Sequence, residues 1–213
     1  AVKDLVKATW SFAEFGASPE LTKEGNTYTY RNTVTLPFKV SNNDNTYWHN
    51  IYLHGGGDNE LYYLYADEEY PTLVSKKSDG QNHPYGDSQW NTAEHADNMS
   101  WSVYHAGNFT FNFKNKLTGK FIQVTSVANA SAENVKFVEE NATAFEIVKD
   151  VNNSRKGDYS LKASVSNTVG YLCNTSHSYA YATHYTGNSH EGGWLNFEEA
   201  PDFTSLIAEV SNV

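Results

Sequence analysis

Short apolar and aromatic runs alternate with polar turn residues along most of the chain. From Trp101 onward nine such runs follow one another, among them WSVYHA (101–106), FTFNFKN (109–115) and GKFIQVTS (119–126). Short runs rich in Val, Ile, Thr, Tyr and Phe, bounded by Asn, Asp, Ser and Gly, are typical of strands joined by turns. Helical periodicity is absent until FTSLIAEVSNV (203–213), which is either a final helical turn or a stalk. The pattern predicts an all-β protein.

The beginning of the chain carries a different pattern. Val2, Leu5 and Val6 have the spacing of one face of a short helix, which Gly16 and Pro19 would interrupt. We therefore expect three parts: an N-terminal appendage (a strand or small helix) over 1–32, a β domain over 33–201, and a C-terminal tail or linker over 202–213.

A polar stretch from Lys76 to Ser100 stands out between the strand-like segments. It contains Gly80, Pro84 and Gly86, together with several Asp and His residues. We expect a long surface loop here. Loops of this length are usually either functional or tolerated insertions, and both interpretations stay open.

Weak internal repetition distinguishes among the β architectures. An aromatic strand, a turn and a second strand recur at 108–123 and at 158–173, and each unit closes with a strand led by an aromatic residue. These leading residues are Trp101, Phe145 and Trp194, spaced 44 and 49 residues apart. A module of this size with four short strands, present three times, predicts a β-trefoil of twelve strands. The three leading aromatic residues should then be buried at equivalent positions.

Composition and charge exclude several function classes. The 213 residues include 15 basic and 25 acidic side chains, a formal net charge of -10, so binding to nucleic acid or to an anionic membrane is disfavoured. The longest apolar runs are far shorter than the roughly 20 residues that a spanning helix needs, so membrane insertion is not expected. One cysteine excludes a disulfide-built scaffold. The chain starts at Ala1, which is compatible with a removed signal peptide and hence with secretion.

The quoted segments resemble a known family. LPFKVSNNDNTYWHNIYL (36–53), WSVYHAGNFTFNFKNKLTGKFIQ (101–123), GYLCN (170–174) and GGWLNFEEA (192–200) are similar to ricin-B-type β-trefoil domains of secreted gut Bacteroidetes proteins. The resemblance implies carbohydrate binding by an accessory domain of a secreted or surface protein. The Gln-x-Trp repeat of ricin-type lectins is absent, so the resemblance transfers no sugar-contact residue.

Catalytic and metal-binding signatures are lacking in the sequence. Glycosidases need two carboxyl groups across a cleft, whereas the acidic residues fall in clusters typical of a solvated face, at 67–69, 139–140 and 198–199. The eight histidines show no zinc-ligand spacing, and Cys173 lies in an apolar strand as a buried small residue would. No nucleotide-binding or nucleophile-elbow motif occurs. We expect no metal, no cofactor and no enzymatic activity.

Sugar recognition needs an aromatic face beside polar hydrogen-bonding groups, and two segments offer both. In the first, aromatic residues alternate with small ones; in the second, a tryptophan, an amide and a carboxylate come together. The first segment contributes Asn174, Tyr179, Tyr181, His184, Tyr185 and Asn188, with His177 beside them, and the second contributes Asp87, Gln89 and Trp90. The competing interpretation is that these aromatic residues pack in the core or fasten the loop.

These observations predict a non-catalytic carbohydrate-binding module that anchors a larger secreted or surface protein to a glycan or glycoprotein. The segment around Tyr185 is expected to carry the site ahead of the loop around Trp90, because rigid strands need less ordering than a loop. The alternative is a protein-interaction or protease-inhibitor trefoil that uses the 76–100 loop. A glycoside hydrolase is a weaker alternative.

Overall fold

The computed structural model divides the chain into two units, residues 1–37 and 38–213. It describes these segments: 18–24, 27–33, 36–54, 61–66, 74–77, 96–127, 134–149, 159–173, 181–183 and 195–200. In the described part, no helix has the length and apolar character needed to cross a bilayer.

The first unit contains an antiparallel hairpin. Strand β1 (Ser18–Glu24) pairs with β2 (Thr27–Thr33), and the register runs from Ser18 opposite Thr33 to Glu24 opposite Thr27. The expected appendage therefore includes two strands. The short helix expected around Val2, Leu5 and Val6 lies outside the described residues.

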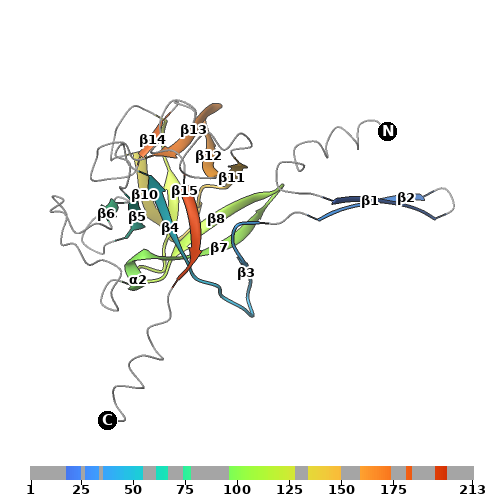
Figure 1. The fold of residues 1–213 in the computed structure, drawn as a ribbon. Helices are drawn as coiled ribbons and strands as arrows, with labels where there is room; N and C mark the ends of the chain where they lie inside the picture. Colours follow the sequence, from blue (N-terminus) through green and yellow to red (C-terminus); the bar gives the residue numbers. More distant parts are fainter. Residues whose placement is uncertain are drawn as a thin grey trace, which may run out of the picture. The chain divides into compact units, whose positions relative to one another are not determined.

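The second unit contains three successive modules of four strands, coloured from teal through green and yellow to red in Figure 1. The first module comprises β4 (His49–His54), β5 (Leu61–Tyr65), β6 (Val74–Lys77) and β7 (Ser100–Gly107). The second comprises β8 (Thr110–Asn115), β9 (Phe121–Val124), β10 (Val135–Val138) and β11 (Phe145–Lys149). The third comprises β12 (Tyr159–Val165), β13 (Thr168–Cys173), β14 (Tyr181–Thr183) and β15 (Leu195–Glu199).

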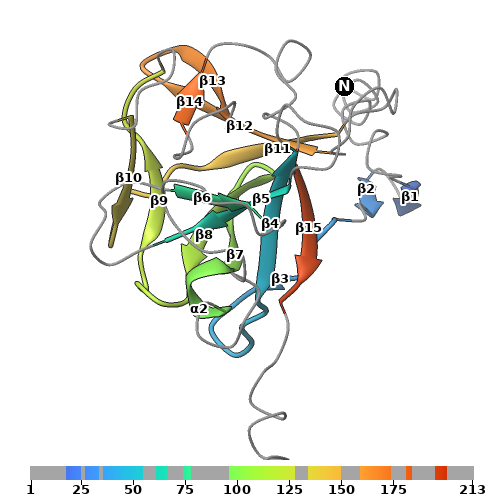
Figure 2. The same cartoon turned by 60° about the vertical axis from the view of Figure 1, so that its left-hand side comes forward.

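Strand pairing identifies the architecture. The first and fourth strands of the modules form a closed ring, in the order β4, β7, β8, β11, β12, β15 and back to β4. The second and third strands of each module pair as the hairpins β5–β6, β9–β10 and β13–β14. A six-stranded barrel with three such hairpins is a β-trefoil (Figure 2). The predicted all-β fold of twelve short strands in three modules is confirmed.

The barrel interior repeats the same arrangement three times. Ile51, Phe113 and Leu161 lie on the first strands and are completely buried. Each faces an apolar residue on a neighbouring fourth strand, in the pairs Ile51–Phe197, Phe113–Val103 and Leu161–Ile147. Burying a side chain of this size contributes about 1.5–3 kcal/mol, so this layer is a main source of stability.

The sequence predicts three equivalent buried residues, one at the start of the fourth strand of each module. The structure confirms two of these residues and corrects the third. Trp101 and Phe145 are completely buried, as predicted. They pair with His49 and Phe111, and the corresponding pair in the third module is Tyr159 with Leu195. The register therefore makes buried Leu195 the third equivalent residue. Trp194, predicted for that position, lies outside the described residues.

The segment before β4 closes one end of the barrel. The Phe38 ring is buried and packs edge-on against Phe197 and Phe111, with ring centroids 4.9 and 5.1 Å apart. Two residues further on, β3 (Val40–Ser41) pairs in parallel with β7. We call residues 38–41 the plug.

The expected loop from Lys76 to Ser100 is wrong at both ends. Strand β6 continues to Lys77, a helical turn, α2, spans Ala96–Met99, and β7 begins at Ser100. Tertiary contacts order this end, because Asn98 and Met99 are buried and the Asn98 amide donates a 2.8 Å hydrogen bond to the Ala66 carbonyl. Residues 78–95 lie outside the described part.

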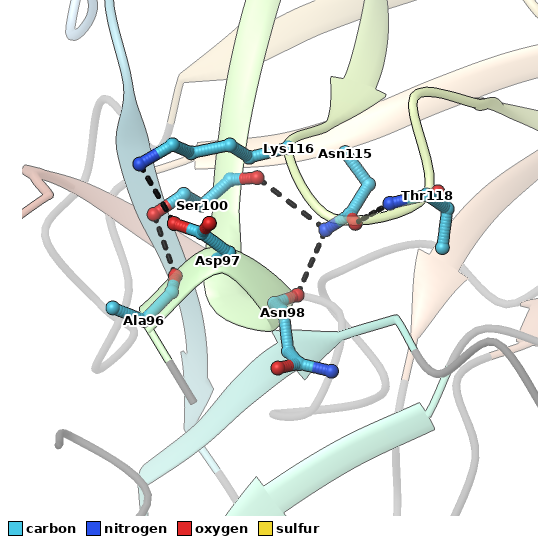
Figure 3. Close-up of polar contacts among 7 residues, drawn as sticks. All are labelled: Ala96, Asp97, Asn98, Ser100, Asn115, Lys116 and Thr118. Atoms are coloured by element: carbon cyan, nitrogen blue, oxygen red, sulfur yellow. Dashed lines mark hydrogen bonds and ion pairs between the residues drawn. The ribbon is translucent and has the colours of Figure 1, made fainter. Parts of the chain in front are cut away.

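A buried amide connects α2 to the turn after β8 (Figure 3). The Asn115 side chain is completely buried, and its Nδ2 donates to the carbonyls of Asn98 at 2.8 Å and of Ser100 at 3.3 Å. Its Oδ1 accepts a 3.1 Å hydrogen bond from the Thr118 backbone N–H. An exposed ion pair between Lys116 and Asp97 adds a second connection at 2.7 Å. This network fixes the start of β7, where Trp101 enters the core.

Candidate functional site

The structure describes only the backbone of one predicted sugar-contact residue. Tyr181 is the first residue of β14, where it lies opposite Cys173. The other candidates lie outside the described residues: Asn174, Tyr179, His184, Tyr185 and Asn188 in the third module, and Asp87, Gln89 and Trp90 in the first. Their grouping into a site therefore stays a prediction.

Strand register brings together three polar and aromatic residues that lie beside the predicted segment. Glu146 on β11 is opposite Lys162 on β12, and Lys162 is opposite Tyr171 on β13. These three residues, here called the module 3 row, alternate with buried Ile147, Leu161 and Leu172 on the same strands. Because successive side chains in a strand point to opposite faces, the row lies on the outside of the barrel wall.

The row continues in register toward the predicted segment. Tyr171 is opposite Thr183, the last residue of β14, and His184 follows Thr183 in the chain. Thr183, which belongs to the sequence-predicted segment, therefore lies on the same four-stranded surface as the row.

A short ion pair holds the two charged residues of the row. Lys162 Nζ lies 2.8 Å from Glu146 Oε2, and the two side chains are 31% and 52% exposed. The hydrogen bond to Glu146 raises the pKa of Lys162, against the opposing effect of burial. Lys162 thus stays charged, and both groups remain open to solvent and able to make further hydrogen bonds.

Tyr171 supplies the aromatic part of the row. Its side chain is partly exposed, and within the described segments no other aromatic ring packs against it. Neighbouring Gly170 and Leu172 are buried, so the backbone beneath the ring belongs to the rigid part of the module. A partly exposed ring on a paired strand is an available platform.

The equivalent positions of the other modules carry different residues. In module 2, Lys114 and Phe121 lie opposite one another; Lys114 Nζ is 5.4 Å from the Phe121 ring centroid, and Tyr104 packs edge-on against that ring. In module 1 the corresponding pair is Tyr52 and Tyr63. The aromatic position of the second strand is thus occupied three times, by Tyr63, Phe121 and Tyr171.

In module 1, the aromatic ring at this position of the second strand is buried. Tyr63 is 7% exposed and clusters with Tyr65 and Met99, and its hydroxyl forms a hydrogen bond with Glu198. Burial, followed by the charge and hydrogen bond of Glu198, raises the pKa of Tyr63. Met99, in α2 between β5 and β7, contributes to this cover, so module 1 offers no open ring at this position.

The carboxylates in the described part are engaged or solvated rather than paired with each other. Glu139 and Glu140 are exposed, and Glu199 forms an exposed ion pair with Lys39 at 3.4 Å, as expected for a wet face. Glu198 differs from that expectation, because it is partly buried and accepts hydrogen bonds from Tyr63 and from Asn50 Nδ2 at 3.3 Å. The cluster at 67–69 lies outside the described residues.

Two other sequence predictions concern metal and thiol chemistry. Cys173 is 1% exposed, which confirms its assignment as a buried small residue. Among the residues placed in the structure, no group of three His, Cys, Asp or Glu side chains is arranged to hold a metal ion.

The module 3 row is not visible as a motif in the sequence. Glu146, Lys162 and Tyr171 are separated by 16 and 9 residues, so no contiguous stretch of the chain contains all three. The available signal was the alternation within 145–149 and 159–165, which places a charged residue between apolar ones.

Comparisons with known proteins return structural similarity only. No family model and no curated protein matches the chain. Similar solved structures include the designed threefold-symmetric protein ThreeFoil, with 12% identity, a TM-score of 0.45, and coverage of 71% of this chain and 98% of that one. A β-trefoil named BEL has 16% identity and a TM-score of 0.45, with coverage of 72% and 92%. The GlcNAcα1-4Gal-releasing endo-β-galactosidase from Clostridium perfringens has 10% identity and a TM-score of 0.48, with coverage of 72% and 33%.

At these scores the neighbours carry no argument about function. The fold assignment rests on the closed ring of strand pairs described above.

Proposed function

We propose that the chain is a non-catalytic carbohydrate-binding module of a larger secreted or cell-surface protein, which it anchors to a glycan or glycoprotein. The observation that carries the proposal is the module 3 row: a partly exposed tyrosine beside an ammonium and a carboxylate on paired strands. The resemblance of the sequence to ricin-B-type domains of gut Bacteroidetes proteins supports the same class.

The chemistry of the row suits a pyranose ring. The face of Tyr171 would cover the apolar C–H face of the sugar, and aromatic side chains contribute large contact area with little loss of conformational freedom. Glu146 would accept hydrogen bonds from hydroxyl groups, and Lys162 would donate to hydroxyl or ring oxygens. Hydrogen bonds to charged groups contribute more than neutral ones, so the pair would orient the sugar on the ring.

Paired strands favour this site over a loop. Lys162 and Tyr171 are held opposite one another in the β12–β13 hairpin, and Glu146 is fixed by its pairing with Lys162. Groups that are already positioned lose less conformational freedom on binding. His184 and Tyr185, which follow β14 in the chain, would extend the same surface.

The first test is binding by the whole chain on a glycan array, followed by calorimetry with a glycan that binds. Tyr171→Ala should weaken binding about tenfold or more, because truncating an aromatic anchor typically costs about 1–3 kcal/mol. Val169→Ala is the matched control: Val169 is 41% exposed, lies on the same strand and has the same facing as Tyr171. Equal affinities of the Tyr171→Ala variant and the parent chain would overturn the assignment of the row.

A second substitution tests the predicted extension of the site. Tyr185→Ala should also weaken glycan binding about tenfold, whereas Trp90→Ala should leave it unchanged. The reverse result would move the site to the loop in the first module. Absence of glycan binding, together with tight association with a protein partner, would instead favour a protein-interaction trefoil.

A further inference from the structure

His49 occupies a position where the other two modules place an aromatic ring. Its pairing partner is Trp101, and the equivalent pairs are Phe111 with Phe145 and Tyr159 with Leu195. His49 lies two residues before Ile51 on β4, so it faces the barrel interior, and it is 5% exposed. A polar, titratable ring thus replaces an aromatic residue at one end of the core.

The imidazole holds the plug through one hydrogen bond. The backbone N–H of Lys39 donates to His49 Nε2 at 2.9 Å, and the adjacent Phe38 ring packs edge-on toward His49 with centroids 6.4 Å apart. Because Nε2 accepts this bond, the ring is neutral and its proton is on Nδ1. His49 Nδ1 is buried and has no hydrogen-bond partner among the described residues.

Two charged groups face His49 from the elements packed against it. Glu199 on β15 lies opposite His49 in the register, and Lys39 belongs to the plug. Burial lowers the pKa of His49 below 6.5; Glu199 opposes this effect and Lys39 adds to it. Glu199 and Lys39 also pair with each other at 3.4 Å, which reduces the charge that either presents to the imidazole.

We propose that His49 is a pH-sensitive latch that keeps the plug seated on the barrel end when the imidazole is neutral and releases it when the imidazole is protonated. Protonation turns Nε2 into a donor, so the Lys39 N–H loses its acceptor. It also places a positive charge beside the Phe38 ring and opposite buried Trp101. The barrel end is closed at neutral pH, and the plug leaves it at mildly acidic pH.

The direction of the pH effect follows from the linkage between protonation of His49 and folding. The folded state binds the proton on His49 less readily than the unfolded state does. The stabilisation of the seated plug by neutral His49 is therefore fully present above pH 6.5, and it is lost as the pH falls through the pKa of His49 in the folded protein.

Amide hydrogen exchange in the whole chain tests the latch. The protection factor of the Lys39 amide, corrected for intrinsic exchange, should fall about tenfold or more between about pH 7.5 and about pH 5. His49→Gln, which offers an uncharged acceptor, should keep protection at both pH values. His105→Gln, at an exposed histidine on β7, should behave like the parent chain. Glu199→Gln should move the midpoint to lower pH.

Unchanged protection of the Lys39 amide in the parent chain over this range, or the same loss of protection in the His49→Gln variant, overturns the proposal. A measurement on the parent chain stands even where that variant fails to fold. The ¹⁵N chemical shifts of His49 should show a proton on Nδ1 at neutral pH. A proton on Nε2 would contradict the hydrogen bond on which the latch depends.

Discussion

At the residue scale, a buried amide side chain links backbone groups at the junction of three elements through hydrogen bonds. Asn115 satisfies two carbonyls and one backbone N–H at the junction of α2, β7 and β8. The two carbonyls also have backbone partners, because the Ala66 N–H donates to the Asn98 carbonyl at 3.0 Å and the Lys116 N–H donates to the Ser100 carbonyl at 2.9 Å. The Asn115 side chain therefore adds a second donor to each carbonyl and supplies an acceptor for the Thr118 N–H.

We predict that Asn115→Ala lowers the free energy of unfolding by about 2–3 kcal/mol, because it removes three hydrogen bonds of a completely buried side chain and takes the acceptor from the Thr118 N–H. Asn112→Ala is the control: its partly buried amide donates one hydrogen bond, to the Thr143 carbonyl at 2.8 Å, and its loss should cost about 1 kcal/mol. Urea denaturation of both variants measures the difference. Equal losses would mean that the Asn115 network contributes no more than a single bond.

Hairpin turns set the register at the scale of the element. Ser166 and Asn167 join β12 to β13 with φ of 50° and 65°, between the paired residues Val165 and Thr168. Two central residues with positive φ form the turn whose twist matches that of paired strands. This turn keeps Lys162 opposite Tyr171, so it positions the module 3 row.

Substitutions at Asn167 should separate backbone strain from side-chain contacts. Asn167→Gly should raise the free energy of unfolding by about 0.5 kcal/mol, since glycine adopts positive φ without steric cost. Asn167→Val should lower it by about 1–2 kcal/mol, because a β-branched residue is strained there. Thermal and urea unfolding measure both effects. A stabilising valine would contradict the assigned turn.

At the scale of the whole molecule, the barrel depends on contacts between modules. Phe113 on β8 lies opposite Val103 and packs against Phe145 with centroids 5.7 Å apart, and its ring stacks on Phe197 at 6.2 Å. Contacts therefore join all three modules through one side chain. This arrangement favours cooperative unfolding of the second unit.

Phe113→Ala should lower the free energy of unfolding by about 3–5 kcal/mol, as expected for truncating a buried phenylalanine. Leu117→Ala, at a side chain that is 39% exposed, should change it by less than about 0.5 kcal/mol. Far-ultraviolet circular dichroism and tryptophan fluorescence should report the same transition in the parent chain. Two separate transitions within residues 38–213 would show that the modules unfold independently.

The sequence by itself determined the fold class and most of the strands of the trefoil. Alternation of apolar and polar residues is a local property with a period of two, so it revealed most strands of the three modules, though not β6, and the inward positions of Trp101 and Phe145. Spacing between aromatic residues then indicated the trefoil. The predicted loop at 76–100 was wrong at its ends because β6 is defined by its pairing with β5 and α2 is held by contacts with Ala66 and Asn115, which the polar composition of this stretch does not reveal.

Only the tertiary structure decided which residues meet. Register made Leu195 the third equivalent core position and aligned Glu146, Lys162 and Tyr171 across three strands. Pairing of β15 with β4 placed Glu199 beside His49, 150 residues away in the chain. Such juxtapositions depend on strand pairing between distant segments, and a shift of one residue would move every side chain to the opposite face. The local pattern shows which face of each strand is buried, but it does not show which distant strand is its partner.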